Sequence, residues 1–149
     1  MKKIILIALL FCLTGCASTH IPLYIQDRKP FTRRFYTSHQ QALAAVKETL
    51  ADLRWAVAEE AEPQIFEVNT EKQSAHEKVL LISEIKVTRM FVVARYARMN
   101  IYIHSTGDVS EVEMRYMVVN GMPLFRPRSY GSESLAKRFF NLVDTHLKQ

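Results

Sequence analysis

Two stretches of the chain carry apolar residues at the three- and four-residue spacing of an amphipathic helix. The first covers residues 38–53, where Ser38 and Gln41 fit the pattern of a capping box ahead of the apolar stripe. The second begins after Ser132 and continues towards the C-terminus. The apolar positions are Leu43, Val46, Leu50 and Leu53 in the first stretch and Leu135, Phe139, Leu142, Val143 and Leu147 in the second.

Between these two helices, apolar and polar residues alternate with the two-residue period of half-buried strands. Trp55 lies where the first helix runs into the next strand, and there it is expected in the core more than as a ligand-stacking residue. A turn or bulge is expected between Arg89 and Ala94, although no Gly or Pro marks it. The predicted segments are strands at 55–60 and 65–70, a polar loop at 71–78 and a further strand within 79–94.

The clearest pair of strands flanks the turn signal at residues 105–108, Ser-Thr-Gly-Asp. A turn of two or four residues would place Ile101 opposite Val112 and Met99 opposite Met114, whereas a three-residue turn would pair apolar with polar residues. The even turn therefore predicts a sheet with one buried face and one solvent-exposed face. The residues expected on the exposed face are Arg98, Asn100, Tyr102, Glu111, Glu113 and Arg115.

Helix, then four to five antiparallel strands, then helix is the order of an α+β two-layer sandwich with both helices on one face of the sheet. A helix that runs straight into a Trp-containing strand, in this order of elements, resembles the helix-grip domains of small outer-membrane lipoproteins, such as one accessory lipoprotein of the β-barrel assembly machine. This resemblance is one of pattern, and it transfers no functional residue to the chain.

The N-terminus has the pattern of a secretory signal peptide. Lys2 and Lys3 precede an uncharged run at residues 4–13. That run is shorter than the roughly 20 residues that a membrane-spanning helix needs. The chain is therefore expected to be exported, with its first residues removed.

The four residues Leu13-Thr14-Gly15-Cys16 resemble the lipobox of bacterial lipoproteins, which is an aliphatic residue and two small residues before a cysteine. The resemblance implies that signal peptidase recognises Leu13, Thr14 and Gly15 and cleaves before Cys16. It also implies a diacylglycerol on the Cys16 thiol and an acyl chain on the new amine. These acyl chains are the only cofactor-like groups expected.

The predicted organisation has three parts. Residues 1–15 form the signal peptide, residues 16–34 form a lipidated N-terminus with a flexible tether, and residues 35–149 form a single α+β domain. The cationic side chains of the tether would contact anionic headgroups or simply remain solvated. Ala17 and Ser18 follow the cysteine without the Asp that retains related lipoproteins in the inner membrane, so the resemblance implies the outer membrane, facing the periplasm. The tether cations are Arg28, Lys29, Arg33 and Arg34.

Charge and cysteine content narrow the possible functions. Removal of Lys2 and Lys3 lowers the formal charge from +5 to +3, a mild excess that does not suggest nucleic-acid binding. Cys12 lies in the discarded segment and Cys16 is consumed by lipid, so no disulfide, thiol nucleophile or cysteine metal site is expected.

The best enzyme-like cluster is His104 with Glu111 and Glu113, but it is interpreted as a charge-balanced solvent face with Arg98 and Arg115 and not as a metal or acid–base site. The sequence thus favours a non-catalytic subunit that binds the membrane through its lipid and assembles with another envelope protein. A carrier of lipid or another amphiphile is the alternative, and a hydrolase is the least supported.

The loop at 125–130 combines aromatic and Arg residues, which are enriched at interfaces, although it also fits an ordinary connector. The candidate contact residues are Arg98, Tyr102, Glu111, Glu113, Arg115, Phe125, Arg126, Arg128 and Tyr130.

Overall fold

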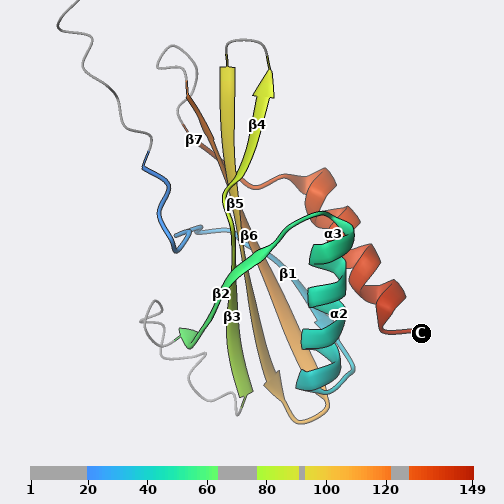
Figure 1. Ribbon diagram of the computed structural model, residues 1–149. Coiled ribbons are helices and arrows are strands. Elements are labelled where there is room, and N and C mark those ends of the chain that lie inside the picture. The colour runs from blue at the N-terminus through green and yellow to red at the C-terminus, as the bar shows by residue number, and fades with distance from the viewer. Residues whose placement is uncertain (1–19, 64–76, 91–92, 122–127) are drawn as a thin grey trace, which may run out of the picture.

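The computed structural model describes residues 20–63, 77–90, 93–121 and 128–149. These residues form two helices and one antiparallel sheet, and both helices cover the same face of that sheet (Figure 1). The predicted α+β class is confirmed, and the sheet has seven strands where four or five were expected. The elements are β1 (Phe31–Phe35), α2 (His39–Asp52), β2 (Val57–Ala61), β3 (Glu77–Ser83), β4 (Lys86–Met90), β5 (Val93–Thr106), β6 (Val109–Asn120), β7 (Arg128–Tyr130) and α3 (Glu133–His146).

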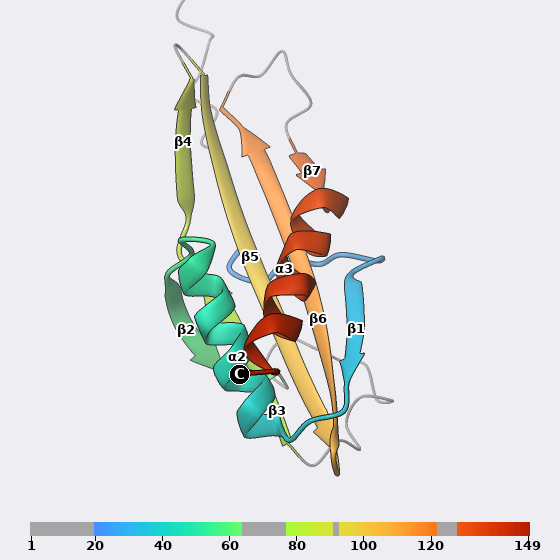
Figure 2. The same ribbon diagram turned by 90° about the vertical axis from the view of Figure 1, so that its right-hand side faces the viewer.

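The long hairpin of β5 and β6 is the centre of the sheet, whose main strand order is β1-β6-β5-β3-β2. β3 and β4 both pair with β5, and β1 and β7 both pair with β6. Two short strands therefore lie one after the other along each side of the hairpin, with β4 and β7 at the end away from its turn (Figure 2).

Both helices begin at the predicted caps. The Ser38 hydroxyl accepts a hydrogen bond from the amide of Gln41 at 3.4 Å, and the Ser132 hydroxyl accepts one from the amide of Leu135 at 3.4 Å. Each contact satisfies one of the backbone amides that the first turn of a helix leaves without an intrahelical partner. The expected starts of both helices are therefore confirmed.

α2 ends in a Schellman motif, which explains why a strand can follow it so closely. The amide of Trp55 donates to the carbonyl of Leu50 at 2.8 Å, and the amide of Arg54 donates to the carbonyl of Ala51 at 2.8 Å. Arg54 sits at the left-handed position of this motif with φ of +57°, where glycine is usual. The reversal carries Trp55 back against the helix, and Trp55 is buried in the core as predicted.

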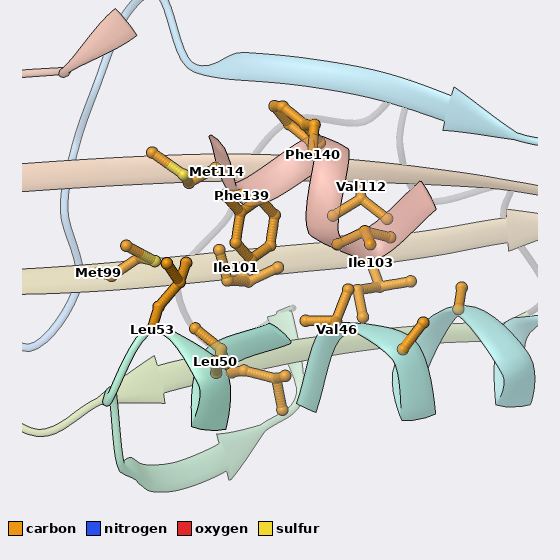
Figure 3. Packing of buried hydrophobic residues seen from close by; sticks show 14 of the residues in the cluster. Val46, Leu50, Leu53, Met99, Ile101, Ile103, Val112, Met114, Phe139 and Phe140 are labelled. Atoms are coloured by element: carbon orange, nitrogen blue, oxygen red, sulfur yellow. The ribbon is translucent and has the colours of Figure 1, made fainter. Parts of the chain in front are cut away.

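The space between the helices and the sheet is filled by aliphatic and aromatic side chains (Figure 3). Val46 and Leu50 of α2 and Phe139 of α3 point towards Ile101 and Ile103 of β5, and all five are at most 2% exposed. Removal of this much apolar surface from water is the main contribution to the stability of the domain.

The β5–β6 hairpin turns through the two residues Gly107 and Asp108, and Gly107 has φ of +60°. Ile101 lies opposite Met114 instead of Val112, so the register is displaced by two residues from the predicted one. Because side chains alternate with a period of two, this displacement leaves every residue on its predicted face. The prediction of the faces was correct, and only the pairing was wrong.

The chain between 77 and 94 forms two strands, where one was expected in 79–94. Ile82 pairs with Asn100, and Lys86 pairs with Ala97. The three residues 83–85 therefore lie opposite the two residues 98–99 of β5, which is a β-bulge. β3 begins at Glu77, within the predicted polar loop 71–78. The turn expected between Arg89 and Ala94 is confirmed, because these residues pair across the β4–β5 hairpin. The strand expected at 65–70 lies outside the described residues.

The flexible tether predicted for residues 16–34 is wrong where the structure describes it. Phe31–Phe35 forms the edge strand β1, and Ile25 is fully buried against the sheet. The periodicity of a helix or strand is missing around Pro22 and Pro30, yet the segment is held by contacts with residues far along the chain. The predicted signal peptide, with Leu13, Thr14, Gly15 and Cys16, lies outside the described residues.

Candidate functional site

Residues 21–25 form a strap that crosses the face of the sheet opposite the helices, and this face is called the strap face (Figure 1). The side-chain oxygen of Asn100 accepts a hydrogen bond from the amide of Ile25 at 2.7 Å, and its side-chain nitrogen donates to the carbonyl of Leu23 at 3.2 Å. Arg98 donates to the carbonyl of Pro22 at 2.8 Å. Polar groups of β5 thus satisfy the backbone of the strap at three points.

Apolar contacts add to these hydrogen bonds. Ile25 is fully buried with Met117 and Val119 of β6, and Ile21 packs against the same cluster. Tyr24 packs against a second cluster, formed around Tyr102 by residues of β3 and β5. The sequence signal for the strap was the presence of four apolar residues among residues 21–25, which is unusual for a solvated linker.

The face predicted to be solvent-exposed is therefore largely covered, and the earlier assignment of its residues as partner contacts is wrong for most of them. The alternation of polar and apolar residues placed them on the correct side of the sheet. Their exposure to solvent was expected only because their side chains are polar, and that expectation is wrong. The strap covers polar side chains that form hydrogen bonds with its backbone or an ion pair with each other, as buried polar groups usually do. The exposed fractions are Arg98 9%, Asn100 0%, Tyr102 2%, Glu113 1% and Arg115 7%.

Glu113 and Arg115 form a buried ion pair beneath the strap. The Nε of Arg115 lies 2.6 Å from a carboxylate oxygen of Glu113, and a second guanidinium nitrogen contacts the same oxygen. Tyr24 covers the guanidinium, with 4.9 Å from its central carbon to the ring centroid. Burial lowers the pKa of Arg115 to about 10, because a desolvated charge is disfavoured.

At the end of the strap face near the β5–β6 turn, a second polar cluster remains open to solvent. This charged corner consists of Arg34, His104 and Glu111. The Nε of Arg34 donates to one carboxylate oxygen of Glu111 at 2.7 Å, and His104 Nε2 lies 3.5 Å from the other. The bond with Glu111 raises the pKa of Arg34. Together with Thr106 and Val109, these residues line an open hollow of about 180 Å³.

The structure brings together only part of the predicted enzyme-like cluster. His104 meets Glu111, whereas Glu113 points to Arg115 beneath the strap. Arg34, which was expected in the tether, pairs with Glu111 and neutralises its charge. Within the described residues, no group of three or more His, Cys, Asp or Glu side chains is placed to hold a metal ion. The corner thus combines Arg34, His104 and Glu111 in one charged cluster.

Two of the remaining predicted contacts lie at the opposite end of the sheet. Arg128 and Tyr130 belong to β7, pair with Val119 and Met117, and are exposed to solvent. Their place in a strand replaces the predicted loop at that position. Phe125 and Arg126 lie outside the described residues.

Comparison with known proteins places the chain in no family. No protein-family model matches it, and no curated protein matches it. Among solved structures, it is similar to the vertebrate conserved region of human METTL16, with a TM-score of 0.47 and 13% identity over 80% of this chain and 98% of that one. Neither helix in the described ranges combines the length and apolar character that crossing a bilayer requires.

Proposed function

We propose that the chain is a lipid-anchored lipoprotein of the bacterial cell envelope that acts as a non-catalytic binding or assembly subunit. The observation that carries the proposal is the N-terminal sequence, in which a dibasic start and a short apolar run end at Leu13-Thr14-Gly15-Cys16. Acyl chains on Cys16 would hold the body at the membrane, since two or more chains anchor stably where one does not. Ala17 and Ser18 favour the outer membrane.

The strap supports this proposal because it sets how far the body can move from such an anchor. The carbonyl of Pro22 is bound to Arg98, and only five residues separate Pro22 from Cys16. At no more than about 3.6 Å per residue, the attachment point would lie within roughly 20 Å of the sheet. A body held this closely is suited to working beside the membrane surface.

The charged corner is the surface that we assign to a protein partner. The Arg34 side chain is 76% exposed there and carries accessible charge, whereas its partner Glu111 is largely covered. Tyr36, which is 93% exposed, follows β1 at the same end of the sheet. Tyr and Arg are the residue types enriched at protein interfaces and at their energetic centres. An exposed aromatic ring beside a charged hollow favours binding of another envelope protein.

An amphiphile carrier has less support. The layer between helices and sheet, where a ligand would be enclosed, is occupied by core side chains such as Leu50, Ile101 and Phe139. The hollow of the charged corner is open and lined by Arg34 and Glu111, a lining that suits polar contacts more than acyl chains.

The anchor is tested by intact mass analysis of the native protein. We expect loss of residues 1–15 and the added mass of three acyl chains on Cys16. Cys16→Ala should retain the full signal segment, whereas Cys12→Ala is the matched control and should be processed normally. A wild-type mass with an unmodified cysteine at position 16 would refute the proposed function.

The partner is tested by in-cell photocrosslinking with a probe residue at position 36, compared with one at Lys137 on the outer surface of α3. We expect one discrete adduct at position 36 and none at position 137. Arg34→Glu should weaken that adduct because it places two acidic side chains together at the corner. Equal labelling at both positions, or none at position 36 in a correctly lipidated protein, would contradict the assignment of the partner surface.

A further inference from the structure

β4 and β7 lie at the end of the sheet away from the β5–β6 turn (Figure 2). There the strap face exposes apolar and basic side chains together. Val87 is 47% exposed and Tyr130 is 49% exposed, and Arg89 and Arg128 are also solvent-exposed. Directly paired residues share a face, so the register places all four on the strap face. One row of register partners across four strands is Val87, Tyr96, Val119 and Arg128, and the next row is Arg98, Met117 and Tyr130.

These two rows form a positively charged surface around the start of the strap, which buries Arg98, Met117 and Val119 between the exposed residues Val87, Arg128 and Tyr130. Four neighbouring strands at about 4.8 Å spacing make it roughly 14 Å wide. Among the described residues of the two rows and of the flanking pair Arg89 and Ala94, none is acidic. The guanidinium of Arg98 is occupied by the strap, so the accessible charge is that of Arg89 and Arg128.

The strap begins beside this surface. Ile21 packs with Met117 and Val119, which belong to the two rows, and the carbonyl of Pro22 is held by Arg98 of the second row. Ile21 and Pro22 thus lie at this end of the strap face, and Cys16 precedes Ile21 by only five residues in the sequence. An acylated Cys16 would bring this end, and not the charged corner at the other end, to the bilayer.

We infer that the surface formed by Val87, Arg89, Arg128 and Tyr130 docks on an anionic lipid bilayer. The inference rests on the proposed function and adds an orientation to it. Tyr is favoured at the membrane interface, and Arg is attracted to anionic headgroups. In this orientation the charged corner faces away from the membrane, where a protein partner can reach it.

The experiment uses the full lipidated protein in vesicles of phosphatidylcholine with 30% phosphatidylglycerol. Acylation of Cys16 leaves no other thiol in the mature chain, so Val87→Cys can be labelled with a fluorophore and its quenching by headgroup-nitroxide lipid measured. Tyr36→Cys is the matched control at the opposite end. We expect quenching at position 87 and little at position 36, with a loss of quenching in high salt.

Charge removal tests the basic side chains directly. Loss of each cation should lower the ratio of docked to undocked protein roughly fivefold. Arg89→Gln with Arg128→Gln should therefore reduce it about 25-fold. Lys137→Gln with Arg138→Gln, on the outer surface of α3, should leave it unchanged.

The outcomes separate the two proposals, because the mass of each sample is measured first. An acylated protein with equal quenching at positions 36 and 87, equal quenching in pure phosphatidylcholine, or no response to removal of Arg89 and Arg128 would overturn the docking surface and leave the anchor intact. A protein without acyl chains would overturn the proposed function and, with it, the docking orientation.

Discussion

Replacement of Asn100 by Leu tests whether the strap is held by the side chain at the centre of β5. Leu has the same number and branching of side-chain heavy atoms as Asn, so the substitution opens no space and removes two hydrogen bonds. Asn100 is fully buried and serves both the amide of Ile25 and the carbonyl of Leu23. No other partner for the Ile25 amide would be created by the change.

The expected loss follows from these two contacts. A net hydrogen bond contributes about 1 kcal/mol, and a buried group left without its partner costs about 1–3 kcal/mol. Because Ile25 is fully buried, the penalty for leaving its amide without a partner is the larger part of the lost unfolding free energy. We therefore expect Asn100→Leu to lower the free energy of unfolding by about 2–4 kcal/mol.

Two measurements check this expectation. Denaturant unfolding, followed by the fluorescence of the single Trp55, gives the global loss, and hydrogen exchange of the Ile25 amide reports opening of the strap. Asn141→Ala, on the exposed surface of α3, is the control and should change the unfolding free energy by less than about 0.5 kcal/mol. If Asn100→Leu behaved like this control in both measurements, the hydrogen bonds of Asn100 would not hold the strap on the sheet.

Four further substitutions test other parts of the structure. Glu113→Gln should lower the unfolding free energy by about 3 kcal/mol, because Arg115 would remain buried without its carboxylate; a loss below 1 kcal/mol in a denaturant titration would contradict a buried pair. Burial raises the pKa of Tyr116, so above about pH 10 the unfolded chain ionises this phenol first and stability falls as pH rises. Tyr116→Phe should lessen that fall, and unchanged pH profiles of the unfolding free energy would contradict it. Arg54→Gly should raise the thermal midpoint by relieving about 1 kcal/mol at a left-handed position, whereas a lowered midpoint would show that Arg54 has another role. Phe139→Ala should cost about 3–5 kcal/mol in chemical unfolding, and a small loss would show that the core can close around the missing ring.

The helices and the faces of the hairpin could be predicted because each has a local cause. Ser38 and Ser132 mark helix starts through side-chain bonds within four residues, and alternation along β5 and β6 fixes which side each residue occupies. The register could not be fixed in the same way, because a shift of two residues leaves the faces unchanged. Only the left-handed conformation of Gly107, placed first in the turn, distinguishes the two registers.

The burial of the strap face could not be predicted from local sequence patterns. Asn100, Glu113 and Arg115 alternate with apolar residues in the way that exposed polar residues do. Asn100 binds the strap, a segment without periodicity. Glu113 and Arg115 pair with each other beneath the strap. A polar residue that accepts a hydrogen bond from a backbone 75 residues away cannot be told from a solvated one by its neighbours. The charged corner was partly predictable, since Glu111 and His104 are register partners, but Arg34 was not expected in a strand.

The distance along the chain between the strap and its binding surface also orders events during synthesis. Ile25 is made 75 residues before Asn100, and at about 5–20 residues per second the ribosome needs roughly 4–15 s to supply that partner. For this interval the N-terminal segment has no sheet to lie on and stays an open chain. Enzymes that act on residues preceding it would meet an accessible substrate, and the strap would close only after β5 has been made.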